Sequence, residues 1–247
     1  MTDQALKRIE QTKAYLYDCL KQSTFFEKHP AKLDYRYQHS LRTAHIASQV
    51  AQTDGLDEEA LVLGCLLHDI SYCREFADQK EWLDHGRTSA HMARPWLLQL
   101  GLEPERVEEI CYGIAIHVDD KADFEGPRTP LAENILMIDN VDRFDCYRIY
   151  EVLENARFSQ MQYEEQIRWL EGQFPKLEMA FQFAYGSPTA IRLWREKARY
   201  HLDFYKKLYA QLTMNDTVGQ RGVDRPCESH HSNESKEDSG HQIAGRF

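Results

Sequence analysis

A histidine and an aspartate at the end of a long apolar run are the residues of this sequence with the clearest chemical potential. His68 and Asp69 directly follow the run Leu61–Leu67, which reads LVLGCLL. A segment of this kind is expected to be buried, and two ionisable groups buried at its end need partners there. Imidazole and carboxylate groups are both common ligands of divalent metal ions, so a bound metal would satisfy the pair.

Two other segments carry similar groups where a helix would face the core. His39 lies on the apolar face of the helix predicted around it, and Asp142 lies in the middle of an apolar stripe. Asp139 comes one turn before Asp142 on nearly the same face. Like charges one turn apart repel each other unless a cation neutralises them. These positions are therefore candidates to complete a metal site with the His68–Asp69 pair.

The elements that must position these groups are predicted to be helices, because apolar residues recur at helical spacing and no long segment alternates like a strand. The sequence holds 12 Gly and 8 Pro, against roughly 30 expected from average usage, which favours long helices. We predict an all-α single domain with polar loops at 71–84 and 119–130. The predicted helices span residues 3–24, 36–53, 58–69, 85–100, 104–117, 131–155, 163–172 and 188–212.

Composition and charge exclude several classes of protein. Hydrophobic residues make up 42% of the 247 residues, and no apolar run approaches the ~18 residues of a membrane-spanning helix. The N-terminus has no apolar signal-peptide core, and none of the six cysteines form a CxxC pair. The net charge of −10 disfavours bulk nucleic-acid binding. We therefore expect a cytoplasmic protein with reduced thiols, no membrane partner and no bulk binding of nucleic acid.

The composition changes at Thr213. The last 35 residues hold almost no large apolar side chains and many Ser, Glu, Asp, His and Gly. Such a segment cannot bury enough apolar surface to offset the entropy of ordering it. Residues 213–247 are therefore predicted to be a disordered tail.

The order of the candidate ligands resembles a known family. His39, His68-Asp69 and Asp142 occur in the strings RYQHSLRTAHIA, LGCLLHDI and LMIDNVDRFD, which are similar to the motifs of the HD-domain superfamily of metal-dependent phosphohydrolases. The last string looks like the ADRL helix of that superfamily, with Asp142 as the ligand. The string YGSPTAIRLWREKARYHLDFYKKL resembles the closing helix of small stand-alone bacterial members.

The resemblance implies a fold and a domain organisation. We expect an HD-domain helical bundle with additional terminal helices and the disordered tail. Residues 1–24 would form an N-terminal helix packing on the core, 25–212 the phosphohydrolase domain, and 213–247 the tail.

The resemblance also implies a chemistry. His39, His68, Asp69 and Asp142 would bind a divalent Mn, Fe, Co, Ni or Mg ion, which suits a mixed nitrogen and oxygen set. The metal would activate water against a phosphomonoester or phosphodiester, with nucleotides among the candidate substrates. Asp69 is the expected catalytic residue, holding or accepting the proton of that water.

Further residues receive roles by their positions in the same pattern. His85 and His117 would complete a second metal site or bind phosphate, so one or two ions per chain are expected. Asp139 and Arg143 are expected to contact the ligands from outside, because both flank Asp142. We assign Arg87 and Lys121 to the substrate phosphate, because they follow His85 and His117 closely. The partner is then a small phosphorylated molecule, and the sequence does not specify the oligomeric state.

Departures from the family pattern narrow the activity. The string HDISYCRE lacks the acidic residues that closely follow the pair in guanosine-tetraphosphate hydrolases, and His85 is not followed by the GYP signature of cyclic-di-GMP phosphodiesterases. Two alternatives stay open. One is a di-iron oxygenase, because a branch of the superfamily uses the same order of six ligands. The other is a non-catalytic binding module with the same fold.

Overall fold

The computed structural model describes residues 1–183 and 185–214, and within them it contains helices and no strand. The all-α prediction is confirmed. The α-helices are α1 (Asp3–Lys21), α2 (Thr24–Lys28), α3 (Pro30–Asp54), α4 (Glu58–Leu67), α5 (Gln79–Leu83), α6 (His85–Gln99), α7 (Pro104–Ile116), α8 (Pro130–Arg143), α9 (Cys146–Asn155), α10 (Tyr163–Ala180) and α11 (Pro188–Thr213). Two short 3₁₀ turns cover Ile70–Cys73 and Phe158–Gln160.

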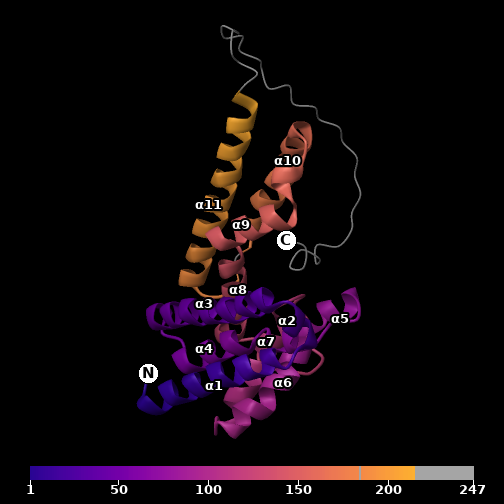
Figure 1. The fold of residues 1–247 in the computed structure, drawn as a ribbon. Helices are drawn as coiled ribbons and strands as arrows, with labels where there is room; N and C mark the ends of the chain where they lie inside the picture. Colours follow the sequence, from indigo (N-terminus) through magenta and orange to yellow (C-terminus); the bar gives the residue numbers. More distant parts are fainter. Residues whose placement is uncertain (184, 215–247) are drawn as a thin grey trace.

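The helices form two regions, a lobe built from α1–α8 and an arm built from α10 and α11 (Figure 1). In the arm the two helices run antiparallel: the Tyr163 hydroxyl donates to the Leu212 carbonyl at one end, and Trp194 Nε1 donates to the Ala180 carbonyl at the other. The start of α11 packs on α3 and α8, which joins the arm to the lobe. In the described part of the chain, no helix is long and apolar enough to cross a lipid bilayer.

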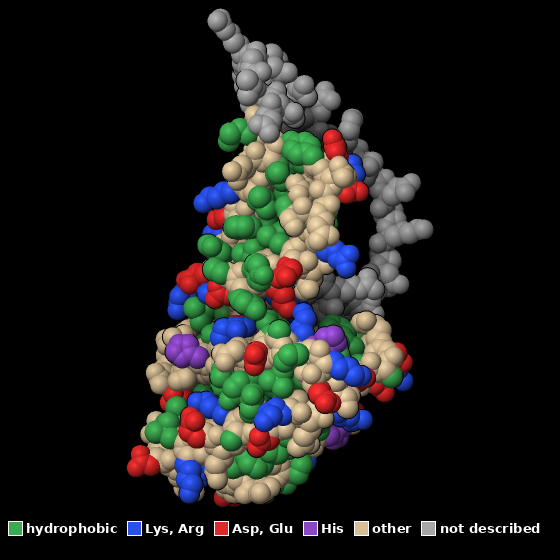
Figure 2. Space-filling model, in the orientation of Figure 1, with side chains coloured by type: hydrophobic (Ala, Val, Ile, Leu, Met, Phe, Trp, Pro, Cys, Tyr) green, Lys and Arg blue, Asp and Glu red, His purple; other side chains and the backbone are tan. Residues whose placement is uncertain are grey.

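Hydrophobic side chains reach the surface of the arm. On the face drawn in Figure 2, charged side chains of both signs are scattered over the two regions, and hydrophobic side chains show along α11. Tyr200 and Phe204 of α11 are among the large side chains that stay exposed.

Helix α4 forms the centre of the lobe. Nearly every one of its residues is buried, and it packs against α1, α3, α7 and α8. An α-helix that is apolar on all sides must be surrounded in this way. Its N-terminus is capped by Asp57, whose side chain accepts a hydrogen bond from the Ala60 backbone N–H. The burial of α4 carries His68 and Asp69, at its end, into the interior of the lobe.

Several predicted boundaries were wrong. Helix α3 begins at Pro30 rather than near residue 36, because proline is favoured at the first position of a helix. The predicted helix 131–155 is two helices, since the Asp145 side chain accepts a hydrogen bond from the Cys146 N–H and caps α9. Helix α10 continues through Pro175 to Ala180 instead of ending near 172.

The loops and the predicted tail complete the comparison with the sequence. The segment 71–84, predicted as a loop, includes most of a 3₁₀ turn and all of α5. Thr213 is the last residue of α11, and the rest of the predicted tail beyond Met214 lies outside the described residues.

Candidate metal centre

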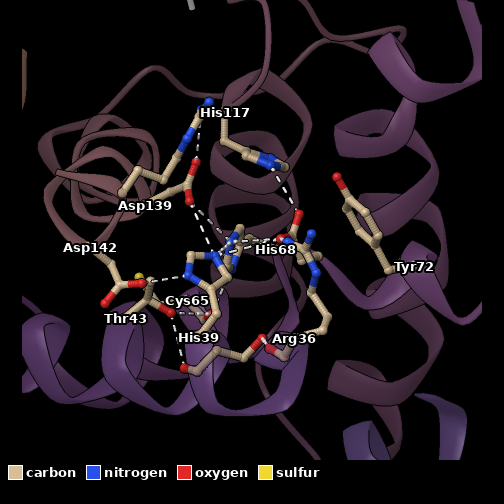
Figure 3. Close-up of polar contacts among 12 residues, drawn as sticks. Arg36, His39, Thr43, Cys65, His68, Tyr72, His117, Asp139 and Asp142 are labelled. Carbon is tan, nitrogen blue, oxygen red and sulfur yellow. Dashed lines mark hydrogen bonds and ion pairs between the residues drawn. The ribbon is translucent and has the colours of Figure 1, made fainter. Parts of the chain in front are cut away.

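Seven histidines and aspartates from separate segments meet in the interior of the lobe, and each is at most 6% exposed. They come from α3, from the ends of α4 and α7, from the first residue of α6, and from α8. Figure 3 shows several of them pointing toward one another. The set consists of His39, His68, Asp69, His85, His117, Asp139 and Asp142.

One half of this cluster is built around His39 and His68. Their Nε2 atoms lie 3.1 Å apart. The Oδ1 atom of Asp139 is 3.2 Å from Nε2 of His39 and 3.6 Å from Nε2 of His68. The Oδ2 atom of Asp69 is 3.6 Å and 3.5 Å from the same two nitrogens. Two imidazoles and two carboxylates therefore converge on one small volume.

The other half is built around His85 and His117, whose Nε2 atoms are 3.2 Å apart. The Oδ1 atom of Asp69 lies 3.2 Å from Nε2 of His85 and 3.6 Å from Nε2 of His117. The Asp69 carboxylate thus turns one oxygen toward each half of the cluster.

The opposite ring nitrogens explain why the Nε2 atoms converge. Nδ1 of His68 lies 2.8 Å from the Cys65 carbonyl oxygen, and Nδ1 of His117 lies 2.7 Å from that of Ile114. Nδ1 of His85 is 2.5 Å from the Trp82 carbonyl oxygen. A carbonyl only accepts, so each Nδ1 must carry the proton, and in the neutral ring Nε2 then presents a lone pair to the centre.

This donor set fits a divalent metal ion. Lone pairs on two Nε2 atoms about 3 Å apart repel each other unless a proton or a cation lies between them. Buried carboxylates also need compensation by positive charge. Among the described residues, three buried groups each offer three donor atoms within 4.8 Å of one another: His39–His68–Asp69, His68–His117–Asp139, and Asp69–His85–His117. Histidine rings oriented by a hydrogen bond at the far nitrogen are typical of metal ligands.

The pKa values reflect the same crowding of charge. Burial alone would lower the pKa of His39, but hydrogen bonds to Asp139 and Asp142 outweigh it and raise that pKa to about 9. Burial would raise the pKa of Asp69, but the Arg36 guanidinium and His68 hold it well below its usual range. Burial lowers the pKa of His85, which favours its neutral form.

Asp142 contacts the cluster from outside. Its Oδ2 atom is 2.7 Å from Nδ1 of His39, the ring nitrogen that faces away from the other histidines (Figure 3). Arg42 binds the same carboxylate through two hydrogen bonds, from Nε to Oδ1 at 2.7 Å and from Nη2 to Oδ2 at 3.0 Å. Asp139 and Asp142 thus take the reverse of their expected positions, with Asp139 at the Nε2 atoms and Asp142 behind His39.

A side-chain hydrogen bond joins α3 to the backbone of α4 beside this cluster. Thr43 donates its hydroxyl to the Cys65 carbonyl at 3.1 Å, the same oxygen that accepts from His68. This contact fixes the His68 ring relative to the helix that carries His39.

A cavity opens over the cluster, and its walls are cationic and aromatic. Three arginines line it, Arg36, Arg143 and Arg148. Arg36 forms an ion pair with Asp69 and lies over the Tyr72 ring, and Arg143 lies 3.8 Å from Asp139.

The aromatic part of the wall is formed by Tyr35, Tyr72 and Trp82. Arg148 and Trp82 belong to no motif, so the sequence predicted no role for either. Only the packing of α9 and α5 beside the cluster brings them to the cavity.

Arg87 and Lys121, expected to bind substrate, are not among the residues that line this cavity. The Arg87 guanidinium is held by Asp84 and Asp119. The backbone carbonyl of Lys121 accepts a hydrogen bond from Arg87 at 3.1 Å. Arg87 therefore lies behind the His85–His117 half of the cluster. Arg143, by contrast, lines the cavity and lies 3.8 Å from Asp139; both residues had been expected to lie just outside the ligand set.

The helical lobe and the buried histidine–aspartate cluster define an all-α protein with a donor set for divalent ions. A family model described as the HD domain matches residues 36–145, which include every residue of the cluster. The chain therefore contains an HD domain over residues 36–145, in agreement with the resemblance drawn from its sequence.

Two solved structures share the fold. A predicted HD superfamily hydrolase from an uncultured Thermotogales bacterium is 16% identical, with a TM-score of 0.54 over 80% of this chain and 91% of that chain. An HD-superfamily hydrolase from Bacillus thuringiensis is 14% identical, with a TM-score of 0.60 over 87% of this chain and 100% of that chain. No curated protein matches the chain.

Proposed function

We propose that this protein is a metal-dependent phosphohydrolase that cleaves a phosphomonoester or phosphodiester. The observation that carries the proposal is the convergence of four imidazole Nε2 atoms and the Asp69 and Asp139 carboxylates in one buried cluster under a cavity. The names of the two structural neighbours, both HD-superfamily hydrolases, support hydrolysis as the reaction class.

In this proposal the cluster holds one or two divalent ions. His39, His68, Asp69 and Asp139 would bind the first. His85, His117 and the other oxygen of Asp69 would bind the second. Asp139 replaces Asp142 as the ligand, and Asp142 orients His39 through its Nδ1 atom. The mixed nitrogen and oxygen donors suit Mn²⁺, Fe²⁺, Co²⁺, Ni²⁺ or Mg²⁺.

A metal ion in this site would lower the pKa of a bound water molecule and polarise a phosphoryl oxygen. The residues of the chain supply the rest of the chemistry. Asp69 is proposed to hold the proton of the attacking water, because its two oxygens lie between the two halves of the cluster. The hydrogen bonds at the Nδ1 atoms keep the histidine rings fixed during turnover, so no ligand has to reorient.

The cavity supports a phosphorylated substrate. The chain carries a net charge of −10, yet Arg36, Arg143 and Arg148 gather at this one cavity. Guanidinium groups bind phosphate oxygens in pairs and fix their geometry. The aromatic wall could hold a planar or apolar leaving group, which is why a nucleotide stays among the proposed substrates.

The proposal is tested on the full chain by elemental analysis and a hydrolysis screen. Wild-type protein is compared with a His68→Ala/Asp69→Ala double variant, which keeps the histidines of residues 215–247 and so controls for adventitious binding there. We expect at least one equivalent of Mn, Fe, Co or Ni that the variant loses, and metal-dependent hydrolysis of p-nitrophenyl phosphate, bis-p-nitrophenyl phosphate or nucleotides. Absence of metal from both proteins after reconstitution would contradict the proposal and favour a binding module.

A di-iron oxygenase is the second candidate. It is favoured by one observation, the division of the Asp69 oxygens between two halves with two histidines each. Two equivalents of iron, oxygen consumption with a candidate substrate and no phosphatase activity would shift the assignment to this reaction.

A further inference from the structure

Arg87 is a half-buried arginine whose guanidinium donates hydrogen bonds to four residues. Its Nε atom donates to Asp84 Oδ1 at 3.0 Å, and Nη2 donates to the Leu83 carbonyl at 3.2 Å. Nη1 donates to Asp119 Oδ1 at 2.7 Å and to the Lys121 carbonyl at 3.1 Å. The guanidinium therefore binds two separate segments of the chain at once.

Those two segments carry the second pair of histidines. Leu83 and Asp84 immediately precede His85, and Asp119 follows His117 by two residues. Arg87 thus ties the start of α6 to the segment that follows α7. The pair His85–His117 lies at this junction. Nδ1 of His85 is held by a carbonyl at the end of α5, Nδ1 of His117 by a carbonyl inside α7, and both Nε2 atoms face Asp69.

The backbones of the two segments also touch. A Cβ atom added to Gly86 would lie 2.8 Å from the Ala115 carbonyl oxygen and 3.1 Å from Nδ1 of His117. Glycine is therefore required for the close approach of α6 to α7 at this point. Gly86 permits the close contact between α6 and α7, and the hydrogen bonds of the Arg87 guanidinium stabilise it.

The two halves of the cluster differ in what supports them. His39 lies in the middle of α3, which packs along the fully buried α4, and His68 follows α4 directly. His117, by contrast, is followed by residues 118–129, which contain no helix. The packing of α6 on α7 holds His85 near His117, and the Arg87 side chain adds the hydrogen bonds that fix the segment after His117 to the start of α6.

We propose that Arg87 is a positioning residue for the His85–His117 half of the centre, and that binding of an ion in that half depends on it. The inference rests on the proposed metal centre. Arg87 would then have a structural role and would not bind the substrate phosphate. Its guanidinium is bound to two carboxylates and two carbonyls, so its charge is already neutralised.

Arg106 offers a matched control. It lies at the start of α7, and it binds Asp57 and Glu59 through a similar fork, with hydrogen bonds of 2.6 Å from Nε to Asp57 Oδ2 and 2.8 Å from Nη1 to Glu59 Oε2. Arg106→Gln and Arg87→Gln each remove one half-buried guanidinium that binds two carboxylates. Only the second removes contacts next to His85 and His117.

The experiment is a titration of the metal-free full chain with Co²⁺, followed by calorimetry and by the visible absorption of the bound ion. We expect two equivalents in wild-type protein and in Arg106→Gln. In Arg87→Gln we expect one tight equivalent, and a second weakened by roughly 10-fold or more, as for other residues that orient ligands. The absorption band of the second ion should change shape, whereas thermal stability of the two metal-free variants should be similar.

Other outcomes are equally decisive. Two equivalents of unchanged affinity in Arg87→Gln would overturn the inference and leave the proposed function standing. A single equivalent in wild-type protein would also overturn it, because the second half would then hold no ion. Absence of any bound ion would contradict the proposed function itself.

The ring ¹⁵N resonances of the metal-free chain give a test that needs no ion. In Arg87→Gln, the resonances of His85 and His117 should shift or broaden while those of His39 and His68 stay unchanged. Unchanged resonances in all four rings would overturn the inference.

Discussion

The buried histidines of the lobe and the one buried histidine of the arm, His201 of α11, have opposite surroundings among the described residues. His39 in the lobe has partners at both ring nitrogens. His201 of α11 is only 5% exposed, and within the described residues neither of its ring nitrogens has a hydrogen-bond partner. Carboxylates raise the pKa of His39 to about 9, whereas burial lowers the pKa of His201 to about 4.

This contrast between His39 and His201 shows that burial alone does not identify a functional histidine. The His201 ring packs edge-on against Tyr205 and Phe144 and behaves as an aromatic core residue. His68, His85 and His117 have a hydrogen bond at Nδ1 and a second imidazole at Nε2. Orientation of the far nitrogen and convergence of the near ones are the features that distinguish a metal ligand.

The largest expected effect comes from Asp139, whose oxygen lies at the Nε2 atoms of the first half. Asp139→Asn should weaken metal binding more than Asp142→Asn. The second variant removes only a group that orients His39, for which roughly 10- to 100-fold is typical. Calorimetric metal titration of both variants provides the measurement. An equal loss, or a larger loss for Asp142→Asn, would return Asp142 to the ligand set.

His201 should make stability depend on pH in the opposite sense to a paired histidine. Its pKa is about 4 in the folded chain and ~6.5 when unfolded. The unfolded chain therefore binds the proton first, and stability is lost as pH falls from ~6.5 to ~4, by up to about 3 kcal/mol. The charge of Arg148 also lowers the pKa of His201, and the Tyr205 ring packs edge-on against the same imidazole.

The test compares urea unfolding of wild-type protein and His201→Phe at several pH values. The free energy of unfolding of the variant should fall less steeply below pH 6.5. Parallel curves would show that His201 is not buried as a neutral ring.

Gly86 should resist substitution by even one methyl group. The added Cβ would meet the Ala115 and Ile114 carbonyl oxygens at 2.8 and 3.0 Å, and these backbone atoms cannot move aside cheaply. We expect Gly86→Ala to destabilise the lobe by about 1–3 kcal/mol, as in other overpacked sites. Thermal unfolding measures this cost. An unchanged melting temperature would contradict the close packing of α6 on α7.

Gly172, in the arm, should respond in the opposite direction. It lies inside α10, and a Cβ added there meets no atom within 4 Å. Alanine is preferred over glycine inside helices, so Gly172→Ala should stabilise the chain by about 0.5–1 kcal/mol. The same thermal measurement applies, and a loss of stability would mean that α10 is more crowded than this packing allows.

Much of the lobe was predictable because its signals are local. Neighbouring residues are enough to recognise the apolar run of α4, the Asp57 cap and the helical spacing around His39. They predicted helices, buried faces and the groups that would meet. The end of α8 and the new helix that Asp145 caps were not predicted, because the apolar stripe of α8 continues at the same spacing into α9.

The details of the site were less predictable because they depend on contacts between distant segments. Asp139 and Asp142 are three residues apart, and both are buried, so periodicity could not tell which one reaches the Nε2 atoms. The partner that distinguishes them is Arg42, 100 positions away from Asp142. Arg87 was assigned to substrate by its sequence position, whereas its contacts with Asp119 and Lys121 follow from the packing of α6 on α7.

Anomalous diffraction from crystals of the full chain loaded with Mn²⁺ would show whether the buried cluster of histidines and aspartates is a metal centre. We expect one peak between His39, His68 and Asp139 and a second between His85 and His117, both in contact with Asp69. Full Mn²⁺ loading with anomalous peaks only elsewhere in the crystal would contradict this expectation.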